Sequence, residues 1–363
     1  MSIETGPRTG HPYFMHDAIL GQPAAFARVV DRLESAARTP DERLAQAARV
    51  FLVGIGTSYH AAQIGEHLLR AYAGGLPVQA CHAFEFALYG PRLGPQDAVV
   101  GVSHRGTKRY TAAALGRARA AGASTVLITG EGGAAAAPEV DRTVETVPPE
   151  RSSAHTISYT GSVAALAWLA DRIGAHREGC RRLGQAFLRT DVPAALHSAL
   201  GAEPRAAEFA QAHAGRRRIW VVGGGPGAVV AHEIALKIKE TSYLGAEGLS
   251  VEAMLHGPFQ CVDPDDLFVL IAQHGPAAGR VADLAAEVRT VGAAMIVVGD
   301  EAAQRIDETA CLVPTVAEPF TGLTCTVPLQ LFAYHLALVR GTNPDGFRLE
   351  DPRFARAYKQ VTL

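Results

Sequence analysis

The sequence lacks the features that mark several classes of protein. Its five cysteines, at positions 81, 180, 261, 311 and 325, form no CxxC pair and no zinc-ligand spacing, which predicts reduced thiols and no metal site. No uninterrupted apolar run reaches the roughly 18 residues of a membrane span. Residues 1–20 carry early charges and no long apolar core of a signal peptide. We therefore expect a cytoplasmic protein with no membrane partner.

An excess of charge of one sign is missing as well. The 34 Lys and Arg residues are balanced by 36 Asp and Glu residues, which leaves a net charge of −2. Such a chain has no general attraction for polyanions, so we expect no nucleic-acid partner. There is no GxxxxGK[ST] motif, and the glycine-rich "GGGPGAVVA" is not followed by an acidic strand end about twenty residues later. A nucleotide cofactor is therefore not expected.

Short apolar segments alternate with helical patterns along the chain. "RVFLVGIGTS", "LPVQAC", "DAVVGVS", "STVLITG" and "DRTVETVP" read as strands, and residues 156–189 read as helical. Strands this short and apolar are buried on both faces, which predicts an α/β fold with a doubly wound parallel sheet. The length of 363 residues exceeds what one core usually supports, so two domains are expected.

The second half repeats the order of the first. "RRRIWVVGGGPG" runs into glycines as "RVFLVGIGTS" does, and "DLFVLIAQH", "AMIVVGD" and "ACLVPTV" follow, with helical segments among them. We predict a tandem of two similar α/β domains. The expected parts are an N-terminal helical segment at 1–48, a first domain at 49–190, a second at 215–345 and a C-terminal tail at 346–363.

Two hydroxyl-rich turns follow strands of the first half. One is Gly56-Thr57-Ser58, and the other runs from Ser103 to Lys108 as "SHRGTK". Ligands of open α/β sheets bind at the carboxyl ends of strands, and a helix N-terminus favours a phosphate. The alternative is that these hydroxyls only cap helices. Two such turns together favour a phosphate site.

Three further features are candidates for chemistry. Glu233, Lys237 and Glu240 share one face of the expected helix "HEIALKIKETSYL", either as a surface ladder or as an acid–base group. His256 precedes a Gly-Pro turn and is either structural or catalytic. The terminal "YKQVTL" is either a plain tail or a segment that carries Lys359 into a site.

The motifs "GIGTSYHAA", "ALKIKETSYLGAEGLSVEAMLHGP", "VPLQLFAYHLALVRGTNPDGFR" and "YKQVTL" resemble the sugar isomerase (SIS) family. The likeness extends over residues 12–363 and is greatest to the isomerase half of glutamine–fructose-6-phosphate aminotransferase. It implies two SIS domains, a C-terminal tail that returns to the active site, a phosphorylated sugar or amino-sugar substrate, no cofactor and a homodimer.

The resemblance also implies roles for individual residues. Lys359 would form a Schiff base with the open-chain sugar, Glu240 would move a proton between C1 and C2, and Lys237 would pair with a carboxylate. His256 would open the sugar ring, often from the neighbouring subunit. The residues implied to bind substrate or phosphate are Gly56, Thr57, Ser58, Ser103, His104, Arg105, Gly106, Thr107, Lys108, Ser153 and Tyr358.

The sequence departs from the family pattern in places. No counterpart of the glutaminase half is present, and the first cysteine is Cys81, so we expect no ammonia release from glutamine by this chain. "SHRGTK" places Arg105 and Lys108 where the family pattern has Ser and Thr, and "AHTI" places His155 where it has Ser.

The reaction we expect is isomerisation of an amino-sugar phosphate coupled to amine release or addition. The alternatives are a fructosamine phosphate deglycase, an aminotransferase fed by a separate amidotransferase, and a sugar-phosphate sensor.

Overall fold

A computed structural model describes residues 6–36 and 42–360. It contains two five-stranded sheets, with strand orders β2-β1-β3-β4-β5 and β10-β9-β8-β6-β7. Every strand pair is parallel. The predicted tandem of two α/β domains with parallel sheets is confirmed.

The strands are short, and each sheet draws all of its strands from one half of the chain. The first sheet holds β1 (Arg49–Gly54), β2 (Val78–His82), β3 (Asp97–Val102), β4 (Ser124–Thr129) and β5 (Arg142–Glu145). The second holds β6 (Ile219–Gly223), β7 (Ala246–Ser250), β8 (Leu267–Ala272), β9 (Ala294–Gly299) and β10 (Cys311–Leu312).

Helices connect the strands and cover both faces of each sheet. The α-helices are α1 (Phe14–Leu20), α2 (Gln22–Ser35), α3 (Glu42–Ala45), α4 (Thr57–Tyr72), α5 (Ala83–Tyr89), α6 (Arg109–Ala120), α7 (Ile157–Glu178), α8 (Val192–Leu200), α9 (Glu203–His213), α10 (Pro226–Ser242), α11 (Val251–Leu255), α12 (Ala278–Val291), α13 (Glu301–Ile306), α14 (Glu318–Thr324), α15 (Thr326–Val339) and α16 (Pro352–Lys359).

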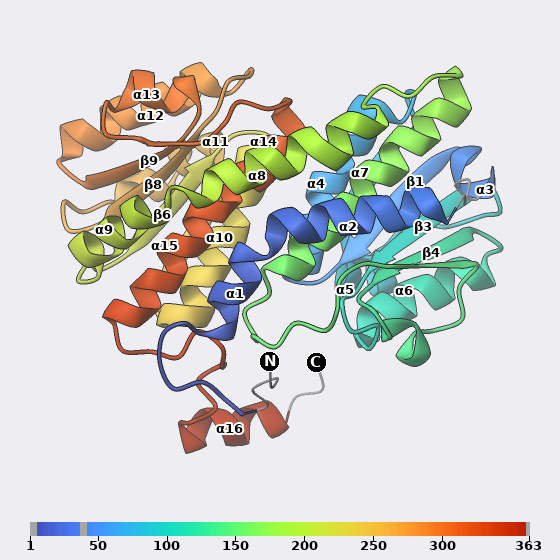
Figure 1. Cartoon of the computed structure of the whole chain (residues 1–363), viewed down its shortest axis with the longest axis horizontal. Coiled ribbons are helices and arrows are strands. Elements are labelled where there is room, and N and C mark those ends of the chain that lie inside the picture. Colours follow the sequence, from blue (N-terminus) through green and yellow to red (C-terminus); the bar gives the residue numbers. More distant parts are fainter. Residues whose placement is uncertain (1–5, 37–41, 361–363) are drawn as a thin grey trace.

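The alternation of side chains along each strand divides the core into layers. In β1, Val50 and Leu52 join a large cluster that includes α4 and α7, whereas Phe51 and Val53 pack with α5 and α6. The large cluster continues into the inner face of the second sheet with α10 and α15. The sheets therefore lie toward opposite ends of the long axis, with these four helices between them (Figure 1). This shared core holds the two halves together.

Two details differ from the sequence prediction. Helix α7 ends at Glu178, and residues 179–186 contain only a short α-helical start, so the expectation of helix through residue 189 is wrong there. Gly179, with φ of 76°, ends the helix because a left-handed residue cannot continue it. The second half also contains β7 directly after α10, a strand for which no separate segment was predicted.

Residues 318–339 would pass for a membrane-spanning helix by length and composition, but 83% of the apolar window is buried inside the fold. That burial is typical of a core helix. The predicted domain limits stay a prediction, and the parts of them at residues 1–5, 37–41 and 361–363 lie outside the described residues.

Candidate functional site

Ten of the fifteen predicted site residues line one pocket of about 920 Å³. Its wall comes from the start of α4, the turn after β3, the loop at 153–155, the second half of α10 and the C-terminal segment 347–358. Helices α4 and α10 contact each other, so the pocket lies where the two halves of the chain meet. This position at the carboxyl ends of parallel strands is where ligands of such sheets bind.

The turn between β1 and α4 forms one side of this pocket. Gly56 precedes the helix with φ of 57° and ψ of −132°, a backbone conformation that favours glycine. The turn directs the first residues of a 16-residue helix toward the pocket, which Gly56, Thr57 and Ser58 all line. The partial positive charge of the helix N-terminus suits a phosphate there.

A buried ion cluster faces the same pocket from α10. Lys237 is fully buried, and its Nζ lies 2.6 Å from Glu240 Oε2 and 3.5 Å from Glu233 Oε1. Nζ also donates to the Thr57 hydroxyl at 3.0 Å, and that hydroxyl donates to Glu233 Oε1 at 3.2 Å. The single Thr57 hydroxyl proton is therefore engaged with Glu233.

Burial and charge set the protonation of this cluster. Burial opposes charge on Lys237, but Glu233 and Glu240 outweigh it and raise the pKa of Lys237 to about 12. Lys237 is thus a fixed cation and not an amine nucleophile. Burial raises the pKa of Glu240, and the ion pair with Lys237 offsets only part of that effect. A carboxyl group with a raised pKa at a pocket wall is suited to accept and return a proton.

Two residues of the site had no predicted role. His60 Nδ1 lies 2.6 Å from Glu233 Oε2, so Glu233 joins the ion cluster of α10 to helix α4. Glu150 is buried and accepts hydrogen bonds from the backbone N–H and hydroxyl groups of Thr156 and Ser158, which shapes the loop around His155. A lone histidine on a helix and a lone glutamate in a loop carry no distinguishing sequence signal.

The turn after β3 brings two cations to the pocket. Arg105 and Lys108 both line it, and burial together with the charge of Arg105 lowers the pKa of Lys108. Burial, reinforced by Arg105, lowers the pKa of His104 to about 4. Burial, reinforced by Lys237 and other cations, lowers the pKa of His155 to about 3. The two imidazoles are neutral at neutral pH, so the positive charge of this end comes from Arg105 and Lys108.

The structure thus brings ten of the predicted residues to one pocket. They are Gly56, Thr57, Ser58, His104, Arg105, Lys108, Ser153, Lys237, Glu240 and Tyr358.

Three residues of the β3 turn do not line the pocket. The Ser103 N–H donates to Ile128 O in the neighbouring strand, and its side chain is buried. Gly106 backs onto Gly133 O, and Thr107 is exposed outside the pocket. The turn therefore presents His104, Arg105 and Lys108 to the pocket and turns its other three residues away from it.

His256 and Lys359 also lie outside the pocket. The His256 side chain is 77% exposed, and its Nε2 lies 3.1 Å from Glu252 Oε2. Lys359 is the exposed last residue of α16, directly after Tyr358, which does line the pocket. Their predicted catalytic roles stay predictions.

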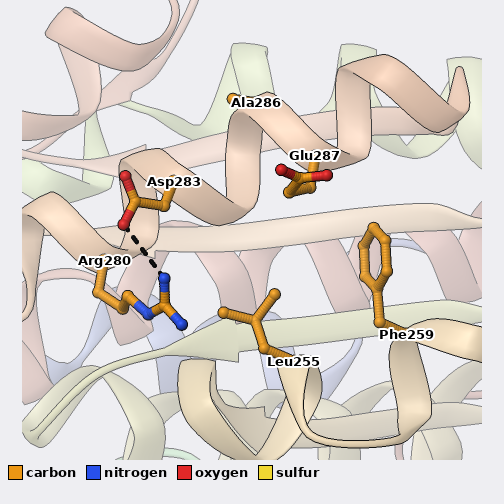
Figure 2. A pocket seen from close by; sticks show the side chains of 6 residues that line it. All are labelled: Leu255, Phe259, Arg280, Asp283, Ala286 and Glu287. Carbon is orange, nitrogen blue, oxygen red and sulfur yellow. Dashed lines mark hydrogen bonds and ion pairs between the residues drawn. The ribbon is translucent and has the colours of Figure 1, made fainter.

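A second hollow of about 380 Å³ lies beside His256. Figure 2 shows Leu255 and Phe259 on one side of it and Asp283 and Glu287 of α12 on the other. Arg280, also in this hollow, makes an ion pair with Asp283 at 3.3 Å. None of the predicted site residues lines this hollow.

The fold and the pocket together define a two-domain α/β protein with a buried cluster of ionised groups beside the start of a helix. Comparison with known proteins makes this specific: a model of the SIS domain family matches residues 43–171 and 214–340, and the chain belongs to that family.

Curated relatives carry the name glutamine–fructose-6-phosphate aminotransferase (isomerizing). The chain is 29% identical to that of Thermococcus kodakarensis over 352 residues, which is 95% of this chain and 58% of the relative. It is 33% identical to that of Caulobacter vibrioides over 344 residues, which is 91% of this chain and 56% of the relative. The chain therefore spans less than two thirds of the length of these relatives.

Solved structures share the fold. The C-terminal domain of glucosamine-fructose-6-phosphate aminotransferase from Francisella tularensis matches with a TM-score of 0.81 at 20% identity, covering 94% of this chain and 99% of that one. Tagatose-6-phosphate ketose/aldose isomerase from Escherichia coli matches with a TM-score of 0.78 at 22% identity, covering 94% of this chain and 97% of that one. Glucosamine-6-phosphate deaminase from Thermotoga maritima matches with a TM-score of 0.71 at 21% identity, covering 92% of this chain and 96% of that one.

Proposed function

We propose that this chain is a phosphosugar enzyme that interconverts aldose and ketose forms and couples this step to amine release from, or addition to, an amino-sugar phosphate. The observation that carries the proposal is the position of Glu240. Its carboxyl group has a raised pKa, is ion-paired to a buried Lys237, and faces the same pocket as the start of α4. A base and an anion site on one pocket are what proton transfer on a phosphorylated sugar requires.

The described residues suggest a division of work. The phosphate would bind at the N-terminus of α4, with the Ser58 hydroxyl and the cations Arg105 and Lys108 around it. Glu240 would take the proton from one of the carbons C1 and C2 and return it to the other. Lys237 would hold Glu240 in place, because its high pKa keeps it charged throughout.

An amine nucleophile is the next requirement, and Lys359 is the candidate. It would attack the open-chain carbonyl carbon, and the carbonyl oxygen would leave as water to give an imine. Because Lys359 is exposed and Tyr358 beside it lines the pocket, a change at the end of α16 must bring the amine inward.

His256 is too exposed to act on this pocket within one chain as described. We propose that a second copy of the chain supplies it for ring opening, as the family resemblance implies. The partly exposed Leu255 and Phe259 beside it offer apolar surface for that contact.

One structural observation favours a second candidate reaction. The pocket volume of about 920 Å³ is near the upper end of the roughly 300–1,000 Å³ usual for small-molecule sites, which favours a substrate with a bulky amine. Deglycation of an amino-acid adduct of a sugar phosphate would use the same imine and the same proton transfer. The relatives' names also keep open an amine delivered by a separate amidotransferase.

The test is a panel of amino-sugar phosphates and fructosamine phosphates, with ammonia and amino-acid release measured for the wild type and for Glu240→Gln. We expect turnover to fall by about 10²–10⁴-fold because the base is lost, with phosphosugar affinity retained. Glu247→Gln, an exposed carboxylate of β7 outside the pocket, is the matched control. Lys359→Ala should also abolish turnover. Full activity of Glu240→Gln would contradict the role of Glu240 as the base, whereas binding without any turnover in the wild type would contradict the enzyme and favour a sensor.

A further inference from the structure

The pocket carries more positive charge than its own carboxylates neutralise. Lys237 is matched by Glu233 and Glu240. The other cations of the lining are Arg105, Lys108, Lys239 and Arg348, and within residues 6–36 and 42–360 none of these four makes an ion pair. A ligand that carries negative charge is therefore favoured in this pocket.

A single phosphate accounts for only part of this charge. A phosphate monoester carries about −1.5 to −2 at neutral pH, which Arg105 and Lys108 beside the proposed phosphate site suffice to match. Arg348 belongs to a different segment, the C-terminal stretch that forms another wall of the pocket. Its charge remains after the phosphate is bound.

Arg348 is held in place by unusual local structure. Its guanidinium carbon lies 5.1 Å from the ring centre of Tyr243 and 4.4 Å from that of Phe354. Arg348 and Tyr243 have φ of 58° and 57°, and they are the only non-glycine residues with positive φ in the described parts of the chain. Such backbone is costly and is concentrated at binding sites. Two residues of this kind in contact at one pocket indicate a built feature.

The nearby carboxylates make no ion pair with Arg348, although its charge helps to lower the pKa of Asp351. Glu350 accepts a hydrogen bond from the Tyr243 hydroxyl at 3.4 Å. Asp351 accepts from the Arg353 backbone N–H at 2.9 Å and pairs with its guanidinium at 2.7 Å. The guanidinium of Arg348 is thus positioned on two rings and left without a carboxylate.

We propose that the pocket binds a phosphosugar that carries a second acidic group, a carboxylate or a second phosphate, and that Arg348 binds this group. The inference rests on the proposed function, because the phosphate at α4 fixes the other end of the substrate. A planar guanidinium fits either acid with two parallel hydrogen bonds. The volume of about 920 Å³ is near the upper end of the roughly 300–1,000 Å³ usual for small-molecule sites.

The test is calorimetric binding of three probes to the full chain at one ionic strength, since exposed charges are screened by salt. Fructose 6-phosphate carries one acidic group, whereas fructose 1,6-bisphosphate and 6-phosphogluconate carry two. The variants are Arg348→Gln and Arg348→Gly, the second of which suits the positive φ and protects folding. Arg356→Gln removes the same charge from an exposed position of α16 outside the pocket and is the control.

We expect the wild type to bind at least one of the two diacid probes about 10- to 100-fold more tightly than fructose 6-phosphate, as a charge-assisted contact provides. Both Arg348 variants should lose this preference and keep their affinity for fructose 6-phosphate, and Arg356→Gln should keep the preference. A preference for 6-phosphogluconate would identify the second acidic group as a carboxylate, and a preference for fructose 1,6-bisphosphate would identify it as a phosphate.

Three results would overturn the assignment: no preference in the wild type, equal weakening of all three probes by the Arg348 variants, or loss of the preference in Arg356→Gln. Binding of fructose 6-phosphate without a preference would leave the proposed function standing. If none of the probes binds to the wild type, the phosphosugar function and the role of Arg348 fall together.

Discussion

Replacing Lys237 by methionine tests the buried ion cluster directly. The change keeps a long, unbranched side chain with a similar helix propensity, so the packing of α10 is nearly conserved. What it removes is the cation that lies 3.5 Å from Glu233 and 2.6 Å from Glu240. Any large effect must then come from the two carboxylates that are left behind.

The cost falls mainly on Glu233. Its side chain is fully buried and keeps only His60 and Thr57 as partners, whereas the Glu240 side chain is 20% exposed and can hydrate. Removing one partner of a buried ion pair destabilises a protein by about 3–5 kcal/mol. We expect the variant to lose this much, which is a large part of the roughly 5–15 kcal/mol that holds a domain folded.

The pH dependence follows from the same group. In the wild type, Lys237 and His60 outweigh burial and lower the pKa of Glu233 below its usual 4.5. Without Lys237, burial dominates and the folded pKa rises above 4.5. The folded variant then holds a proton that the unfolded chain releases, so its stability falls as pH rises above that value. The deficit of Lys237→Met should therefore be larger at pH 8 than at pH 5.

Urea denaturation followed by tryptophan fluorescence is the assay. Trp168 and Trp220 are the chain's two tryptophans, and both are buried, one in each half, so both halves are reported. Lys239→Met, on the exposed side of the same helix, should change stability by less than about 0.5 kcal/mol. A loss below about 1 kcal/mol in Lys237→Met, or equal losses at both pH values, would refute the assignment of a charged, interdependent cluster.

Two further predictions concern the β3 turn and its neighbours. Gly106 has φ of 71°, and a Cβ there would overlap Gly133 O, so Gly106→Ala should lower the free energy of unfolding in urea by about 2 kcal/mol or more. The control is Gly116→Ala, which lies in open space on helix α6 and should be neutral or stabilising. Equal effects of the two changes would contradict the turn geometry. Burial lowers the pKa of His155 from 6.5 to about 3, so the unfolded chain binds its proton first as pH falls. The free energy of unfolding of the wild type should therefore fall between pH 6.5 and pH 4, and it should fall less steeply with pH in His155→Gln. Equal slopes in the two proteins would show that His155 is not held neutral.

Much of the fold could be predicted from the sequence because its strands are short and wholly apolar. Val50–Val53 and 98–102 are buried on both faces, as a parallel sheet between helix layers requires. Strand β7 escaped prediction because "AEGLS" is neither apolar nor alternating. It lies at the edge of the second sheet, where pairing with β6 alone is enough to hold it.

The helical spacing of Glu233, Lys237 and Glu240 predicted their common face, but not their burial. A surface ladder and a buried cluster have the same spacing. The difference arises from the packing of α10 against α4, a contact between segments about 170 residues apart that only the folded chain provides. The partner His60 was missed for the same reason.

The tandem repeat also explains why a phosphate is expected in one half only. Gly225 before α10 has φ of 54° and ψ of −127°, nearly the conformation of Gly56 before α4. The first turn continues into Thr57, which has a backbone N–H, but the second continues into Pro226, which has none.

A carboxylate of the protein also occupies the space at the second turn. Glu318 Oε1 lies 3.7 Å from where a Cβ on Gly225 would be, and it lies close to Gly275 after β8 as well. The positive end of α10 is therefore already faced by an anion, and a phosphate would be repelled there. What the second half contributes to the pocket is the other end of the same helix, where Lys237 and Glu240 lie beside the turn before α4. In the proposed function, the first α/β half would thus provide the anion site and the second the acid–base group.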